Sequence, residues 1–189
     1  MTPVFTGTVD NNDIFTLTEL KNFLRVENSV DNDLILALRD AAILYVEEVC
    51  NTKLGAYTAT FYMDYFRHAI FPVGPVTAIA SVYYMEATAT KTFVELSANN
   101  YFSDFASIPA RISFNDPPSV AEDEFSRVKI TGTVGHPVAN IPQMMKSAMQ
   151  LLIGHLYENR TAEIIGTISS PIQLGVHALL SPYRVIWNR

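Results

Sequence analysis

The chain has 189 residues, of which 49% are hydrophobic and 17% charged, and its formal net charge is −6. This length and composition suit one well-packed domain with an inserted or appended subdomain, and they argue against two independent domains. The acidic balance argues against a surface that holds nucleic-acid phosphates tightly.

The chain begins with a segment that shows no structural pattern. Residues 1–15 are polar and without periodicity, which predicts a mobile N-terminal arm. A first helix is expected over residues 16–25, because Thr16 and Glu19 have the spacing of a capping box and apolar residues follow at helical intervals.

A second and longer helix is expected over residues 32–51, with Asp31 as its N-cap. Most of its apolar residues share one face, as a helix packed on a core requires. Three others, Leu36, Ile43 and Leu44, lie off that face. They must be covered either within the domain or by a neighbouring copy of the chain.

The hydrophobic period changes from helical to alternating after the second helix. Residues 57–65 alternate as a half-buried strand does, and further strand patterns continue to residue 134. We therefore expect an inserted antiparallel sheet over about residues 56–134. Its clearest loop is residues 116–125, where two prolines precede a group of acidic residues.

The last part of the chain returns to a helical pattern. A long helix is expected over residues 142–159, with Pro142 at its start, and a short one over residues 174–181. The loop over residues 161–173 is expected to be mobile. The predicted fold is therefore α+β and mainly helical: residues 16–189 form a single domain with four helices and one small inserted sheet.

We find no motif for catalysis, a cofactor or a metal. The histidines lack the spacing of paired metal ligands, and no phosphate-binding or dinucleotide-binding glycine motif occurs. The single cysteine, Cys50, excludes an intramolecular disulfide and a cysteine cluster for zinc. We therefore predict no catalytic, cofactor-binding or metal-binding residues. No export signal and no stretch able to span a bilayer is present, so we expect synthesis in the cytoplasm and no membrane partner.

Two groups of residues are candidates for contacts with other proteins. Glu158 and Arg160 lie at the end of the long C-terminal helix, where a solvated last turn is the alternative interpretation. Tyr183, Arg184 and Trp187 are of the residue types that dominate interface hot spots, although a terminal aromatic group can also dock back on its own fold.

The order of these segments resembles that of the tailed-phage head-tail connector proteins, the adaptors beneath the portal. The resemblance covers nearly all of Leu17 to Val185. It rests on the segments LTELKNFLRVENSVDNDLILALRDAAILYVEEVCN, FPVGPVTAIASVYYM, LSANNYFSDFASIPARISF, VKITGTVG, IPQMMKSAMQLLIGHLYENR and LGVHALLSPYRV.

The resemblance implies a structural role in head completion and virion assembly. A member of this family forms a homo-oligomeric ring, expected to be a dodecamer in the virion neck, that docks on the portal protein after DNA packaging. The ring extends the DNA channel, lets DNA pass without tight binding, and supports a tail-side stopper or tail-completion protein.

The same resemblance implies roles for the candidate residues. Tyr183, Arg184 and Trp187 would reach the portal, and the long helices would pack between subunits. The resulting subunit-contact candidates are Leu36, Ile43, Leu44, Glu158 and Arg160.

Two alternatives stay open. The chain could be a tail-completion or stopper protein from the same phage gene region. It could also be an unrecognised enzyme, in which a pocket would bring His155 together with Asp64 or Glu95.

Overall fold

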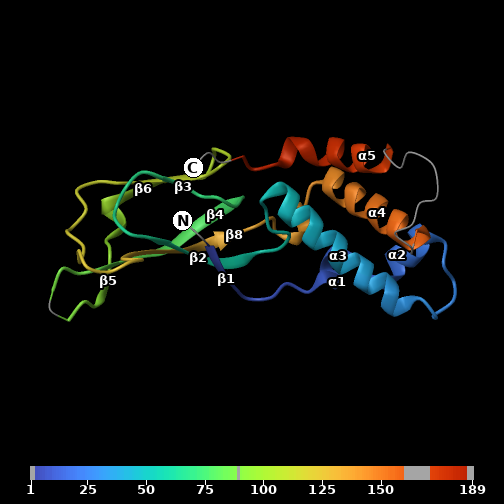
Figure 1. The fold of residues 1–189 in the computed structure, drawn as a ribbon, viewed down its shortest axis with the longest axis horizontal. Helices are drawn as coiled ribbons and strands as arrows, with labels where there is room; N and C mark the ends of the chain where they lie inside the picture. The colour runs from blue at the N-terminus through green and yellow to red at the C-terminus, as the bar shows by residue number, and fades with distance from the viewer. Residues whose placement is uncertain (1–2, 89, 160–170, 187–189) are drawn as a thin grey trace. The chain divides into compact units, whose positions relative to one another are not determined.

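The computed structural model describes residues 3–88, 90–159 and 171–186 (Figure 1), with side chains omitted for residues 171–174. Contacts divide the chain into two compact units. The sheet unit comprises Met1–Thr8, Gly55–His136 and Val185–Arg189, and the helical unit comprises Val9–Leu54 and Pro137–Arg184. The two units are described separately below.

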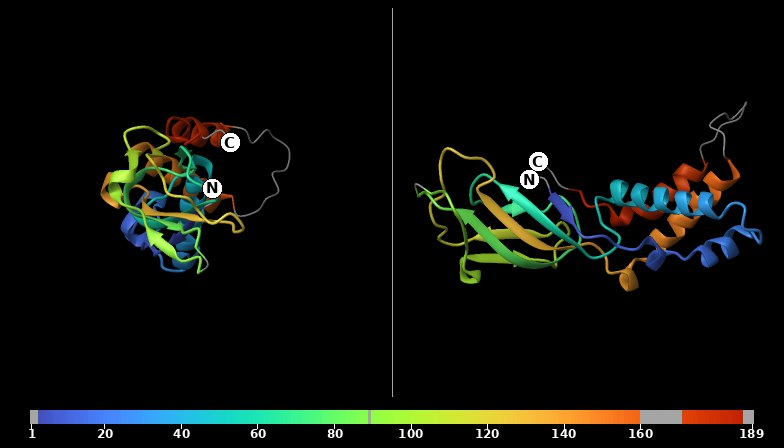
Figure 2. Two further views of the ribbon diagram at one scale, coloured as in Figure 1. Left: turned by 90° about the vertical axis from the view of Figure 1, so that its left-hand side faces the viewer. Right: turned by 90° about the horizontal axis from the view of Figure 1, so that it is seen from below.

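The helical unit is built mainly from three packed helices. In addition to the short helix α1 (Asn11–Ile14), it contains α2 (Leu17–Leu24), α3 (Asn32–Cys50), α4 (Gln143–Glu158) and α5 (Pro171–Leu180). Helix α4 packs against both α3 and α5, and the three lie beside one another in Figures 1 and 2. Their facing sides form one core, whose fully buried members include Leu20, Ile35, Val46, Met145, Met149, Ile153 and Leu180.

Helix α2 begins with the capping box that the sequence predicts. The Glu19 backbone N–H donates to Thr16 Oγ1 over 3.2 Å, and the Thr16 backbone N–H donates to Glu19 Oε2 over 2.8 Å. These bonds satisfy two helix-end donors and hold the pKa of Glu19 below its usual range, mainly through the backbone bond from Thr16. Leu20, in the next turn, is then placed in the core.

Removing this cap should produce a moderate loss of stability. We expect Thr16→Ala to lower the free energy of unfolding by about 1 kcal/mol, because one N–H at the helix start loses its acceptor. Equilibrium urea unfolding followed by circular dichroism measures the difference. Thr18→Ala, at an exposed position of the same helix, is the matched control and should change the value by less than about 0.5 kcal/mol.

The sheet unit contains two antiparallel sheets. The larger has the order β1 (Pro3–Thr6), β2 (Tyr57–Met63), β8 (Val128–Val134), β4 (Val76–Met85) and β5 (Phe93–Glu95). The smaller has the order β3 (Ala69–Ile70), β7 (Arg111–Phe114) and β6 (Tyr101–Asp104). Side chains from both sheets share one core, in which the rings of Phe61 and Phe71 meet edge to face at 4.8 Å.

Strand β8 is the centre of the larger sheet. Its residues alternate between buried and half-buried, as the period-two pattern predicts, and it pairs with β2 on one side and β4 on the other. Gly132 lies opposite Ala59 and Ile79. A Cβ atom at Gly132 would lie 2.5 Å from the Ala78 carbonyl oxygen, beside a register shift in β4. Glycine therefore permits the close approach of these strands.

The structure corrects the expectation of an unpatterned arm over residues 1–15. Pro3–Thr6 forms β1, which pairs with the edge of β2 from Pro3 opposite Phe61 to Thr6 opposite Thr58. Ile14 and Phe15 are buried in the helical core. A four-residue strand is too short to show a period, and its partner lies more than fifty residues away in the sequence, so local reasoning could not find it.

The described residues combine helices with antiparallel sheets, so the predicted α+β class is confirmed. Helices α2, α3 and α4 lie within the predicted ranges 16–25, 32–51 and 142–159, whereas α5 begins three residues before the predicted start at residue 174. The strands β2 to β8 fall within the predicted insertion over residues 56–134. That residues 16–189 act as one connector domain stays a prediction.

Candidate functional site

The residues suggested for the enzymatic alternative have local structural partners. His155 Nδ1 lies 3.1 Å from Asn159 Nδ2 at the end of α4 in the helical unit. Asp64, in the sheet unit, accepts a hydrogen bond from the Ser126 backbone N–H over 2.9 Å. Among the described residues, no group of three or more histidines, cysteines and acidic residues is placed to hold a metal ion.

Cys50 is a core residue at the end of α3. Its side chain is fully buried, and its Sγ lies 3.9 Å from the Leu180 carbonyl oxygen. Burial raises the pKa of the thiol to about 11, so very little reactive thiolate forms at neutral pH. None of the described helices is long and apolar enough to cross a bilayer.

The chain after α5 makes contacts with its own subunit. Residues Ser181–Tyr183 form a short 3-10 turn, and the Tyr183 side chain packs partly against the helical core. The exposed Arg184 donates from Nε to the Val49 carbonyl oxygen, near the C-terminus of α3, over 3.2 Å. A cation there complements the negative end of the helix dipole. Tyr183 therefore packs back on its own fold in part and Arg184 is exposed to solvent, and a contact of this segment with another protein stays a prediction.

Two further residues complete this end of the chain. Val185 is buried in the sheet unit, where a Cβ atom at Gly74 would lie 3.1 Å from Val185 Cγ2, whereas Ile186 is 73% exposed. The sequence analysis missed Ile186, although an isoleucine directly after the YRV segment was a visible signal. Trp187 lies outside the described residues.

The subunit-contact candidates on α3 have three different environments. Ile43 is buried in the core of its own helical unit, so the structure removes it from the set of accessible contact residues. Leu36 is half-buried, and Leu44 is 59% exposed. Ala37 and Ala41, which the sequence analysis did not select, are exposed on the same face as Leu44. At the end of α4, Glu158 is exposed, and Arg160 lies outside the described residues.

The β6–β7 hairpin presents exposed apolar side chains, one in β6 and two in the turn, that the sequence analysis also missed. Phe102 is 64% exposed, Phe105 is 37% exposed and Ile108 is 73% exposed. The run FASIP between two strand patterns was an available signal, because a polar connection would ordinarily carry fewer large apolar residues.

Asp104 holds this turn in one conformation. Its carboxylate accepts hydrogen bonds from the Ala106 and Ser107 backbone N–H groups, from Ser107 Oγ over 2.6 Å and from Arg111 Nη2 over 2.6 Å. The Ser107 hydroxyl, followed by the Arg111 guanidinium, holds the pKa of Asp104 well below its usual range. The turn therefore keeps an ionised carboxylate and a defined shape at neutral pH.

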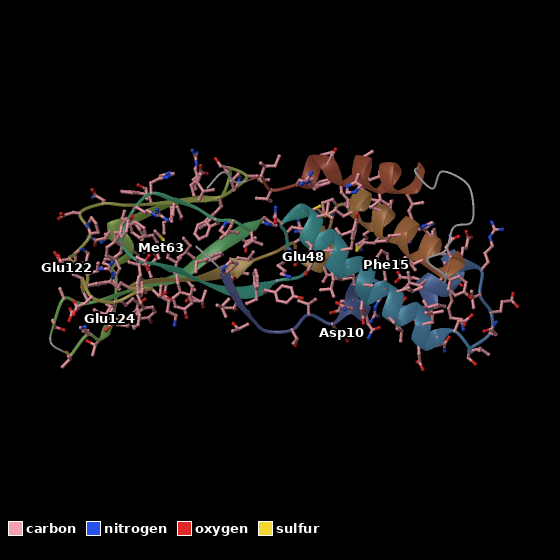
Figure 3. All side chains as sticks on the ribbon, viewed as in Figure 1. Asp10, Phe15, Glu48, Met63, Glu122 and Glu124 are labelled. Atoms are coloured by element: carbon pink, nitrogen blue, oxygen red, sulfur yellow. The ribbon has the colours of Figure 1, made fainter. Side chains whose placement is uncertain are left out.

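The acidic loop that the sequence predicts over residues 116–125 is tied to Lys91, in the β4–β5 connection, and to Arg127, directly before β8. Lys91 Nζ bridges Asp123 Oδ2 at 3.0 Å and Glu124 Oε1 at 3.1 Å, and Arg127 Nη1 donates to the Ala121 carbonyl oxygen. Figure 3 shows Glu122 and Glu124 at the same end of the sheet unit. Phe125, between these anchors, is 85% exposed.

Comparison with protein families and solved structures finds one matching family and several structures that share the fold. Residues 14–184 match the model of the Phage gp6-like head-tail connector protein family. This range includes α2 to α5 and every strand from β2 to β8. No curated protein matches the chain.

Three similar solved structures come from gene transfer agent (GTA) particles. A chain in the neck of the empty GTA particle, computed with C6 symmetry, has 20% identity and a TM-score of 0.76, with 100% of this chain and 98% of that chain covered. Chains in the neck of the native particle, computed with C12 symmetry, and in the native virion have 18% identity, the same coverage, and TM-scores of 0.75 and 0.77. At these identities, the likeness shows a shared fold.

Proposed function

Because the chain belongs to the phage gp6-like head-tail connector family, we propose that it is a structural protein of the virion neck that forms a ring under the portal. The family match over residues 14–184 is the single observation that carries this proposal. The family is one of structural connectors and not of enzymes, and the shared fold with neck proteins of a symmetric particle supports the ring.

The proposed ring is a dodecamer that extends the DNA channel and supports a tail-side stopper or tail-completion protein. The net charge of −6 per subunit suits a channel through which DNA slides, since repeated negative charge repels the phosphates instead of binding them. The accessible side chain of Arg184 and the neighbouring Tyr183 and Trp187 are proposed to contact the portal protein.

Electron microscopy of the purified protein with and without its cognate portal tests the proposal. We expect rings attached to the portal, and Arg184→Ala together with Trp187→Ala should reduce the fraction of occupied portals about tenfold or more, as loss of interface anchors does. Arg67→Ala, an exposed arginine of the sheet unit, is the control and should leave occupancy unchanged.

Two other results would count against the proposed connector role. A protein that stays monomeric at high concentration and does not bind the portal would contradict the connector role. Binding to a preassembled connector and portal complex, but not to the portal alone, would instead favour the tail-completion or stopper alternative.

A further inference from the structure

The β6–β7 hairpin carries three exposed large apolar side chains, close together in the sequence, that the proposed portal contact does not use. We call Phe102, Phe105 and Ile108 the hairpin tip. Two of these side chains are well over half exposed, and the third is more than one-third exposed. Clustered large apolar side chains in solvent typically mark a contact surface, whereas isolated ones do not.

Hydrogen bonds also hold the hairpin tip in one conformation before any partner binds. Asp104 accepts four hydrogen bonds from the turn and from Arg111, as described above. A surface that is already ordered loses less conformational entropy on association than a flexible loop does. The fixed conformation of the turn therefore favours a role in docking.

The charge of the tip indicates what kind of partner can approach it. Over residues 101–114 the only charged residues are Asp104 and Arg111, which pair with each other, so this stretch has no net charge. The whole chain carries a formal charge of −6. The tip is therefore a part of the surface that a second acidic copy can approach without like-charge repulsion.

A complementary surface lies on the outer face of α3. Ala37, Ala41 and Leu44 follow one another at helical spacing and are all exposed, and we call them the α3 stripe. Two alanines beside a leucine leave a shallow apolar surface, bordered on the same helix face by Asp33 and Asp40, against which large side chains can pack closely. Glu48, labelled in Figure 3, continues the same face with a charge and ends the stripe.

We propose that the hairpin tip of one copy docks on the α3 stripe of the next copy in the ring. This inference rests on the proposed function, because it names the partner of two surfaces within that assembly. The contact joins two different surfaces. Each copy therefore contacts one neighbour through its hairpin tip and the other neighbour through its α3 stripe. Such head-to-tail contacts produce closed rings when the rotation between copies closes.

The two surfaces can be inactivated separately with charges. The tip variant carries Phe102→Asp and Ile108→Asp, and the stripe variant carries Ala41→Asp and Leu44→Asp. All four positions are exposed, so circular dichroism spectra should match those of the wild type. We expect each variant to self-associate at least about 30-fold more weakly, as loss of hot-spot residues does. Phe125→Asp, at a residue that is even more exposed and lies in another loop, is the control and should assemble as the wild type does.

Mixing the two variants gives the sharpest result. The intact tip of the stripe variant can dock on the intact stripe of the tip variant, but neither partner has a second working surface. Mass photometry, alone or on the cognate portal, should therefore show mixed pairs that do not grow further. Variants that assemble like the wild type, or that form no pairs when mixed, would overturn this inference alone. A wild type that assembles neither alone nor on the portal would overturn the proposed function as well.

Discussion

Replacing Glu47 with alanine is expected to lower the free energy of unfolding by about 3 kcal/mol, one of the largest losses from a single polar side chain in this protein. Glu47 lies near the end of α3 and is only 5% exposed. Its carboxylate accepts a hydrogen bond from the buried Leu54 backbone N–H over 2.8 Å and pairs with Lys53 Nζ at 2.5 Å. Alanine removes both contacts and leaves a buried N–H group without its acceptor.

The backbone of Glu47 also shapes the end of the helix. Asn51 adopts the left-handed conformation with φ of 50°, and the Thr52 backbone N–H donates to the Glu47 carbonyl oxygen over 3.0 Å. This is the hydrogen-bond pattern of a Schellman-type helix end. The backbone and the side chain of Glu47 thus direct the chain out of α3 together.

Urea unfolding of matched variants separates these contributions. Glu47→Gln keeps an acceptor oxygen for Leu54 but removes the charge, so it should cost less than Glu47→Ala. Glu48→Ala, at the exposed neighbouring residue, should change stability by less than about 0.5 kcal/mol. Equal losses for Glu47→Ala and Glu48→Ala would show that the buried contacts of Glu47 contribute little.

Replacing Gly132 with alanine should also destabilise the protein by about 3 kcal/mol, in this case by overpacking. The added Cβ would meet the Ala78 carbonyl oxygen at 2.5 Å, and that oxygen belongs to the backbone of the paired strand. A side chain could rotate away, but here β4 and β8 must move apart. Strand β8 lies between β2 and β4. A shift of β8 therefore weakens its hydrogen bonds to both of these strands.

Hydrogen exchange with mass spectrometry locates the effect of Gly132→Ala. Peptides from β2, β4 and β8 should exchange faster than in the wild type. Gly154→Ala, in helix α4, provides the opposite control, because its Cβ would make ordinary contact with Phe23 at 3.4 Å. Alanine has the higher helix propensity, so this variant should be more stable by about 0.5–1 kcal/mol. Unchanged exchange in the three strands would contradict the overpacking argument.

The helices were predictable because their signals are local. The capping residues Thr16 and Glu19 of α2 are close together in the sequence, and the apolar residues of α3 recur at intervals of three and four. The structure places a helix at each of these patterns. The alternation in β2 and β8 is similarly local, since one face of each strand is buried. The class of the fold and the order of its segments followed from these patterns, and the family resemblance that they carried is confirmed.

Features that depend on distant contacts were not predictable. The role of β1 depends on the free edge of β2, which lies more than fifty residues away. Ile43 lies off the main apolar face of α3, and the sequence period left open whether its own domain or a neighbouring copy covers it; the structure places it in the core of its own helical unit. The hairpin tip was missed because only the fold reveals that Phe102 and Ile108 remain exposed beside a turn fixed by Asp104.

The burial of Cys50 makes the native chain convenient for site-specific labelling. Burial raises the pKa of the Cys50 thiol to about 11, so far less of it is thiolate at pH 7 than for a solvent-exposed cysteine. A maleimide dye should therefore react selectively with a cysteine introduced on the surface, without first replacing Cys50. Fluorescence energy transfer between labelled copies could then follow neck assembly in real time in an otherwise native background.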